Sequence, residues 1–247
     1  MPGGVSKKMK NPFLRKALDI YFTRYNNGKK KLYRKENEEH AKAAESGEEK
    51  TGPIVFLGDS ITDYYDLKKF YPDLNCVNRG ISGNTTNDIL NRMKVSVFDA
   101  SPSMVIMLIG INDMMNEERK PGDVAADYER IVCYMADRLP GVPVILQSVY
   151  PGWDGDAEKA KKGPTMQVFP IAYLRDDIKA LNSMIREIAD EYGYVYADVY
   201  SRLATEEGLM NPEYSVDGCH PVEAGYKAVT EVLRPLIDEL QAKDAAL

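Results

Sequence analysis

The sequence predicts an α/β protein whose central sheet is parallel and is covered by helices on both faces. From residue 52 onward, short apolar runs alternate with segments of helical periodicity, which is the pattern of parallel strands joined by crossover helices. At 247 residues, with 44% hydrophobic and 28% charged residues, the chain has an ordinary globular composition and is long enough for a full hydrophobic core.

Five apolar runs are predicted to be the strands of this sheet: residues 54–57, 76–78, 104–109, 142–147 and 195–197. Helices are predicted between and after them, over residues 86–97, 123–138, 171–192 and 221–242. The segment 150–169 has no predicted element and is rich in Gly, Pro and Lys. A loop of that length in a compact domain is usually functional or mobile.

Residues 1–50 differ from the rest and are predicted to be an N-terminal helical extension of a domain that spans residues 51–247. Apolar residues recur at three- and four-residue steps over residues 13–25, which predicts an amphipathic helix ending at Asn27-Gly28. Residues 29–50 are mostly Lys, Glu and Ala, typical of a solvated helix or a linker. We expect the extension to pack on the main domain or on a second subunit. Tethering to a partner and a homo-oligomer through residues 13–25 are the alternatives in which the extension itself is functional.

The charge distribution argues against several classes of partner. Residues 1–50 carry 13 Lys and Arg against 7 Asp and Glu, a net +6, and the remainder carries −12. An acidic body has no electrostatic footprint for nucleic acid, and the interspersed acids and tyrosines of the N-terminal stretch disfavour a membrane-surface helix. No stretch approaches 18 uninterrupted apolar residues, so membrane insertion is not expected.

Cysteine usage and the start of the chain favour a cytoplasmic protein. Cys76, Cys133 and Cys219 are odd in number and far apart, which argues against a disulfide framework or a thiolate zinc site. The first residues lack the apolar core of a signal peptide.

The loops that follow the strands form the candidate site, because ligands of open parallel sheets bind beyond the carboxyl ends of the strands. These loops are polar or glycine-rich and comprise residues 58–60, 79–84, 110–113 and 148–150. Ser60 directly follows the first strand and is a candidate nucleophile, although a serine there is often only a helix N-cap. The loop 80–84 offers backbone N–H groups and Asn112 offers a side-chain amide for an oxyanion, with turn and cap roles as the alternatives.

The chain has only two histidines, so there are few candidates for an imidazole general base. His40 lies in the charged N-terminal stretch and is most simply a solvated surface residue. His220 follows Asp217 by three residues, so the carboxylate can reach Nδ1 of the imidazole in a tight turn and direct Nε2 toward a proton. Pro221 suits the first position of a helix, which would place His220 at a helix start. By itself this pair is a weak signal.

Taken together, the first three of these loops and the segment around Asp217 and His220 resemble the four sequence blocks of the SGNH hydrolases, the GDSL esterase and lipase group. The matching residues are 58–60, 78–86, 110–113 and 217–221, in the family's order. The resemblance implies a catalytic triad of Ser60, His220 and Asp217. It also implies an oxyanion hole made by the backbone N–H groups of Ser60 and Gly83 and the side chain of Asn112.

The same resemblance implies a flavodoxin-like three-layer α/β/α sandwich with a five-stranded parallel sheet. It further implies serine-esterase chemistry through an acyl-enzyme, with no metal and no organic cofactor. Residues 1–50 lie outside the resemblance.

Substrate preference follows less directly from the sequence. The forms of the second and third blocks are closest to small-acyl esterases, including carbohydrate acetylesterases and platelet-activating-factor acetylhydrolase-like proteins. We therefore expect a small-molecule, acetyl-type ester, with Asp59, Tyr150 and Trp153 as candidate substrate contacts and a plain lid as the alternative for the 150–169 loop. Lysophospholipase or acyl-thioesterase activity, and a non-catalytic ligand-binding protein with the same fold, are the alternative functions.

Overall fold

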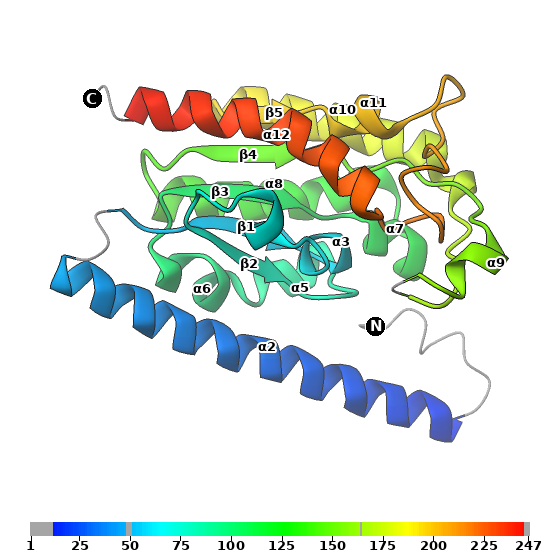
Figure 1. The fold of residues 1–247 in the computed structure, drawn as a ribbon, viewed down its shortest axis with the longest axis horizontal. Helices are drawn as coiled ribbons and strands as arrows, with labels where there is room; N and C mark the ends of the chain where they lie inside the picture. The colour runs from blue at the N-terminus through cyan, green and yellow to red at the C-terminus, as the bar shows by residue number, and fades with distance from the viewer. Residues whose placement is uncertain (1–11, 48–50, 164, 245–247) are drawn as a thin grey trace. The chain divides into compact units, whose positions relative to one another are not determined.

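The computed structural model describes residues 12–47, 51–163 and 165–244 (Figure 1). Five parallel strands form one sheet in the order β2-β1-β3-β4-β5. The strands are β1 (Ile54–Gly58), β2 (Cys76–Gly80), β3 (Met104–Leu108), β4 (Val144–Gln147) and β5 (Val195–Ala197). The predicted three-layer α/β/α class, its five-stranded parallel sheet and the N-terminal helix are confirmed.

The described chain divides into two compact units. The first holds the residues up to Arg119 together with Ala126–Val144, and the second holds Lys120–Ala125 together with the residues from Ile145 onward. Each unit contributes its own strands and its own strand-end loops, so each is described by itself.

In the first unit, β1 lies between β2 and β3, with Gly58 in register with Gly80 on one side and Leu108 on the other. The three strands therefore end at the same level, which brings the loops after them to one edge of the sheet. A side chain at Gly58 would place a Cβ only 2.2 Å from Thr62 Oγ1 and 2.5 Å from the carbonyl oxygen of Leu108. Glycine is required there because the chain turns back onto itself directly after β1.

Short helices follow these strands. They are α3 (Ser60–Asp63), α4 (Leu67–Phe70), α5 (Thr86–Leu90), α6 (Met93–Ser96), the 3-10 turn η1 (Phe98–Ala100) and α7 (Ile111–Glu117). The single helix predicted over 86–97 is wrong, because the chain breaks at Asn91-Arg92 between α5 and α6. The break accompanies the burial of the Arg92 side chain, which is only 2% exposed.

The N-terminal helix α2 (Pro12–Ser46) is longer than predicted and does not end at Asn27-Gly28. A glycine inside a helix destabilises it by only about 1 kcal/mol relative to alanine, so tertiary packing can keep the chain helical at Gly28. That packing is supplied by Tyr33 and Asn37, both buried, one and two turns beyond Gly28. Helix α2 packs on α6 and η1 of the same unit (Figure 1).

The second unit contains the β4–β5 pair and longer helices. They include α9 (Ala157–Ala160), the 3-10 turn η2 (Ala172–Leu174), α10 (Arg175–Tyr192), α11 (Val199–Leu203) and α12 (Glu223–Asp244), whereas α8 (Pro121–Arg138) has residues in both units. Helix α12 begins at Glu223, so the prediction that Pro221 opens this helix is wrong by two residues. The first residues of the predicted helix over 171–192 form η2 instead of continuous α-helix.

Candidate active site

Ser60 is the first residue of α3 and directly follows β1 and its cap residue Asp59. The Asp59 carboxylate accepts a hydrogen bond from the backbone N–H of Ile61 at 2.9 Å, which caps the helix. Ser60 is 8% exposed. Its position at the start of a capped turn holds the residue in a defined orientation at the strand edge.

Asp59 has a structural role that the sequence did not reveal. The side chain is fully buried and also accepts a hydrogen bond from Asn112 Nδ2 at 3.1 Å, which ties α3 to α7. A fully buried carboxylate offers no surface to a ligand, so this geometry gives no support to the predicted substrate contact. An aspartate directly before a one-turn helix is a signal of an N-cap, and that signal could have identified the role.

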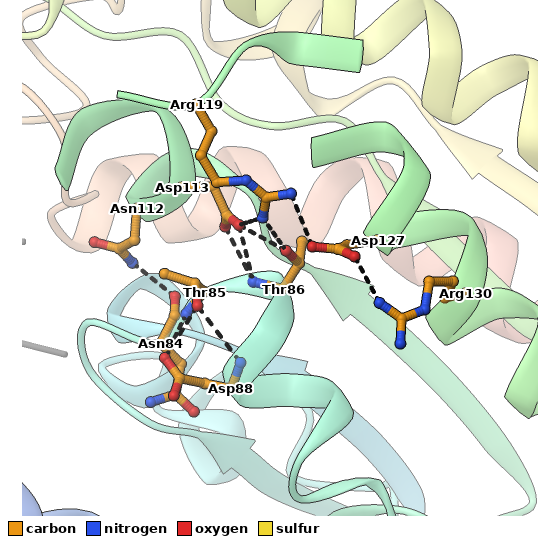
Figure 2. Close-up of polar contacts among 9 residues, drawn as sticks. All are labelled: Asn84, Thr85, Thr86, Asp88, Asn112, Asp113, Arg119, Asp127 and Arg130. Carbon is orange, nitrogen blue, oxygen red and sulfur yellow. Dashed lines mark hydrogen bonds and ion pairs between the residues drawn. The ribbon is translucent and has the colours of Figure 1, made fainter. Parts of the chain in front are cut away.

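The loop after β2 forms a tight turn around Gly83. The backbone N–H of Asn84 donates to the carbonyl of Ile81 at 3.1 Å, and Gly83 has φ +77°. A left-handed φ is costly for residues with a Cβ, which is why glycine fits this position. Thr85 then caps α5 through a reciprocal pair of hydrogen bonds with Asp88 (Figure 2).

The Asn112 amide is already engaged in this structure. Its Nδ2 donates to the carbonyl of Asn84 at 3.0 Å (Figure 2). The same Nδ2 also donates to Asp59, and Oδ1 accepts from Asn116 at 2.8 Å. Asn112 therefore lies beside the Gly83 turn, and its role as an oxyanion donor stays a prediction. To serve as one, it must exchange one of its two present acceptors for the oxyanion.

A buried network next to Asn112 joins α5 to α7. Asp113 accepts hydrogen bonds from the backbone N–H of Thr86 at 3.0 Å, from Thr86 Oγ1 at 2.6 Å and from Arg119 Nη1 at 2.9 Å. Figure 2 shows Arg119 continuing this network to Asp127, which in turn pairs with Arg130. Burial raises the pKa of Asp113 to about 6, although the bonds from Thr86 and the charge of Arg119 oppose the rise.

Arg92 links the carboxyl ends of β1 and β2 to the Gly83 turn through hydrogen bonds. It donates to the carbonyls of Gly58 and Arg79 at 2.8 and 3.0 Å, and its Nε donates to Asn84 Oδ1 at 2.7 Å. Burial lowers the pKa of this guanidinium to about 10, so it is charged at neutral pH. Sequence reasoning missed Arg92, because an arginine between Asn91 and Met93 gives no sign that its side chain is buried.

In the second unit, Asp217 and His220 form a hydrogen-bonded pair. Asp217 Oδ2 lies 2.8 Å from His220 Nδ1, and Oδ1 accepts from the backbone N–H groups of Cys219 and His220 at 2.9 and 2.8 Å. Burial alone would raise the pKa of Asp217, but the bonds from His220 and from these amides outweigh it and lower the pKa to about 2. The carboxylate is thus an anion that faces Nδ1 and fixes the imidazole ring.

The segment 150–169 is anchored to this turn. Trp153 donates from its backbone N–H to the carbonyl of Gly218 and from Nε1 to the carbonyl of Ser215, both at 3.0 Å. Phe169 donates to the carbonyl of Asp217 at 2.6 Å, and its ring meets the His220 ring edge-on at 5.0 Å. Sequence reasoning missed Phe169, which is a neighbour of His220.

The two aromatic candidates in this segment differ in exposure. Tyr150 is only 3% exposed and its hydroxyl donates to Gln147 Oε1 at 2.7 Å, so its ring belongs to the core. This burial gives no support to a substrate contact by Tyr150. Trp153 is half-buried, and its predicted role as a substrate contact stays a prediction.

The structure thus places the predicted residues in two groups. Within the first unit, Ser60, Gly83 and Asn112 lie in the loops after β1, β2 and β3, and Asn112 bonds to both of the other loops. Within the second unit, Asp217 and His220 are paired. The assembly of Ser60 with His220 into a triad stays a prediction.

Among the described residues, no cluster of three or more His, Cys, Asp or Glu side chains could hold a metal ion. Among the same residues, no helix combines the length and the apolar character that crossing a membrane requires.

Comparison with known proteins identifies relatives of this chain. The GDSL-like Lipase/Acylhydrolase family matches residues 56–228. The platelet-activating factor acetylhydrolase IB subunit alpha2 of Rattus norvegicus is 24% identical over 198 residues, covering 78% of this chain and 79% of the relative. The acetylxylan esterase of Geobacillus stearothermophilus is 34% identical over 93 residues, covering 28% and 42% of the two chains.

Solved structures show the same fold. A protein from Streptococcus pneumoniae aligns with a TM-score of 0.75 at 24% identity, covering 94% of this chain and 100% of its own. A GDSL-like lipase from Bacteroides thetaiotaomicron aligns with a TM-score of 0.64 at 24% identity, covering 81% and 97%. With a family match that spans all four strand-end loops, this chain belongs to the GDSL-like lipase/acylhydrolase family and is a carboxylic ester hydrolase.

Proposed function

We propose that this protein hydrolyses short-chain, acetyl-type carboxylic esters, with Ser60 as nucleophile, His220 as general base and Asp217 as the carboxylate that orients the imidazole. The observation that supports this most directly is the buried Asp217–His220 pair at 2.8 Å, because a carboxylate on Nδ1 fixes the tautomer in which Nε2 accepts a proton.

The proposed reaction has two halves. Ser60 Oγ attacks the ester carbonyl carbon while its proton passes to His220 Nε2, which gives a tetrahedral oxyanion. The oxyanion accepts hydrogen bonds from the backbone N–H groups of Ser60 and Gly83 and from Asn112, after the amide has released Asn84 or Asp59. His220 then protonates the leaving alcohol, and water repeats the sequence on the acyl-enzyme.

The preference for a short acyl group is supported by the relatives. Both curated relatives are named for acetyl groups, one as an acetylhydrolase and one as an acetylxylan esterase. Acetylated carbohydrates are the proposed substrate class, because the half-buried Trp153 lies against the turn that holds His220 and sugar rings stack on indole.

Hydrolysis of p-nitrophenyl esters from acetyl to octanoyl, by wild type and Ser60→Ala, tests the proposal. We expect turnover to peak at acetyl and to fall by about 10³ or more in the variant, because the nucleophile is lost. Ser46→Ala, at an exposed serine of α2, is the matched control and should act like wild type. Equal turnover by wild type and Ser60→Ala would contradict the assignment of the nucleophile.

The same assay separates the alternative functions. Turnover that rises steadily to octanoyl would indicate a lysophospholipase or acyl-thioesterase. A non-catalytic binding protein would not react with a fluorophosphonate, whereas the proposed serine should be labelled in wild type and not in Ser60→Ala.

A further inference from the structure

Asp63 lies where three parts of the first unit meet. It is the last residue of α3, and its backbone N–H donates to the carbonyl of Asp59 at 2.9 Å, so its position is coupled to the turn that carries Ser60. Its side chain is only 4% exposed. A carboxylate buried to this degree needs several hydrogen-bond donors in place of water.

Those donors come from α2 and from the Gly83 turn. Asp63 Oδ1 accepts from Lys29 Nζ, and Oδ2 accepts from the hydroxyl of Tyr25, both on α2. Oδ2 also accepts from Ser82 Oγ at 2.8 Å, and Ser82 directly precedes Gly83. One carboxylate therefore connects the N-terminal helix, the nucleophile helix and the turn with the proposed oxyanion glycine.

Further contacts of α2 hold the same loop. The Tyr33 hydroxyl donates to the carbonyl of Gly80 at 2.6 Å, and Asn26 Oδ1 accepts from Asn84 Nδ2 at 3.2 Å. A Cβ at Gly80 would lie 2.2 Å from the backbone nitrogen of Asp63, so the end of β2 and α3 are in direct contact. Helix α2 thus contacts the loop on both sides of Gly83.

The side chains of α2 suit a permanent structural contact. Burial, followed by the hydrogen bond to Asp63, raises the pKa of Tyr25, so its hydroxyl stays a donor into the alkaline range. Arg79, which is fully buried next to Gly80, pairs with Glu36 and Asn37 of α2 and stacks on the Tyr33 ring at 4.5 Å. Without α2 this buried cation would lose its acidic partner and the ring beneath it.

We propose that Asp63, held by Lys29 and Tyr25 of α2 and by Ser82, is a positioning residue that sets the distance between the backbone N–H groups of Ser60 and Gly83. This group is called the Asp63 junction. The proposal rests on the proposed function for its effect on catalysis. It assigns a role in transition-state stabilisation to the N-terminal helix, which lies outside the matched family region. Tyr25, Lys29 and Asp63 touch no substrate in this role.

The test compares Lys29→Met, Lys29→Arg and Asp63→Asn with wild type, using p-nitrophenyl acetate. We expect kcat to fall about tenfold in Lys29→Met and Asp63→Asn with KM within about twofold, because misplacement by a fraction of an ångström weakens transition-state contacts more than substrate binding. Lys29→Arg should recover most of the loss. The double variant Lys29→Met/Asp63→Asn should have a kcat no lower than that of Asp63→Asn alone, since both changes break the same Lys29–Asp63 interaction.

Lys35→Met is the matched control, because it removes a cation from the same helix. Lys35 is 73% exposed and pairs with Glu39 one turn along the same helix, so wild-type kinetics are expected. Wild-type kcat in both Lys29→Met and Asp63→Asn would overturn the Asp63 junction. An equal loss in Lys35→Met would also overturn it, by showing a general effect of charge.

Hydrogen exchange separates a failure of this inference from a failure of the proposed function. If wild type and Ser60→Ala hydrolyse esters equally, the proposed function is wrong. The Asp63 junction is then tested by the exchange rates of the backbone amides of residues 81–84. Faster exchange of these amides in Asp63→Asn than in Lys35→Met supports the junction, and unchanged exchange overturns it. Tyr25→Phe, which removes a single hydroxyl, serves in the same measurement if a charge-changing variant does not fold.

Discussion

At the scale of single residues, Asp217 accepts hydrogen bonds on both carboxylate oxygens, from His220 and from two backbone amides. These bonds are made only in the folded chain and lower the pKa from 3.8 to about 2. Because the folded-state pKa lies below that of the unfolded chain, Asp217 stabilises the fold above about pH 4, and this contribution is lost as the pH falls through 2.

The contribution amounts to roughly 2 kcal/mol at neutral pH, from 1.36 kcal/mol per pKa unit. Asp217→Asn should therefore lower the free energy of unfolding by about that amount at pH 7. Urea denaturation of both proteins between pH 2 and pH 7 measures the difference, which should shrink below pH 4. A difference that stays constant over this range would contradict the assigned cause.

Arg92 presents the opposite case of a buried cation that bonds to neutral oxygens. Arg92→Met would leave the carbonyls of Gly58 and Arg79 and the Asn84 side chain without this donor. We expect the free energy of unfolding to fall by about 3 kcal/mol, since each unsatisfied buried acceptor costs on the order of 1–3 kcal/mol.

Thermal and urea unfolding would measure this loss. Arg130→Met is the control, because Arg130 is 63% exposed and its pair with Asp127 should contribute less than about 1 kcal/mol. Equal effects of the two substitutions would show that the Arg92 bonds do not stabilise the strand ends.

At the scale of elements, β1 and β3 could be predicted because each is a continuous apolar run that is buried at every residue. The one-turn helices α3 and α4 could not, since four residues are too few to show a helical period. The site followed the same rule. Ser60 and Asn112 could be proposed because they follow strands, and Gly83 because of the family resemblance, whereas the supporting residues Arg92 and Asp63 lie outside any motif.

The length of α2 gives a prediction at this scale. Gly28→Ala should raise the free energy of unfolding by about 0.5–1 kcal/mol, because alanine favours a helix interior and nothing lies within 4 Å of the new Cβ. If the helix instead ended at Asn27-Gly28 with a left-handed glycine, alanine would destabilise the protein. Urea denaturation of the full chain distinguishes the two signs, with Asn27→Ala, at an exposed neighbour in the same helix, as the control.

At the scale of the whole molecule, the predicted homo-oligomer through residues 13–25 and the division at residue 50 stay predictions. Phe13 and Tyr21 of α2 are 83% and 60% exposed, whereas the Tyr25 hydroxyl donates a hydrogen bond to Asp63. Removal of residues 1–50 would test both ideas poorly, because it also strips the partners of Arg79. A point substitution on the exposed face is the cleaner test.

Tyr21→Glu should lower the mass measured by light scattering if this face holds two copies together, because it places a charge in an apolar contact. Tyr173→Glu, at a tyrosine that is 70% exposed in the second unit, should leave the mass unchanged. A wild-type protein that is already a monomer would contradict the assembly.

The contacts of α2 also bear on how the protein is made. The helix leaves the ribosome before its partners, which lie between Asp63 and Asn84 and follow within the next few dozen residues. Such modest separations make for early docking during synthesis. The nascent chain can therefore dock α2 against the Gly83 turn before Asp217 and His220 have been translated, so, on the proposed function, a ribosome-bound intermediate would hold its proposed oxyanion donors in place before the proposed general base exists.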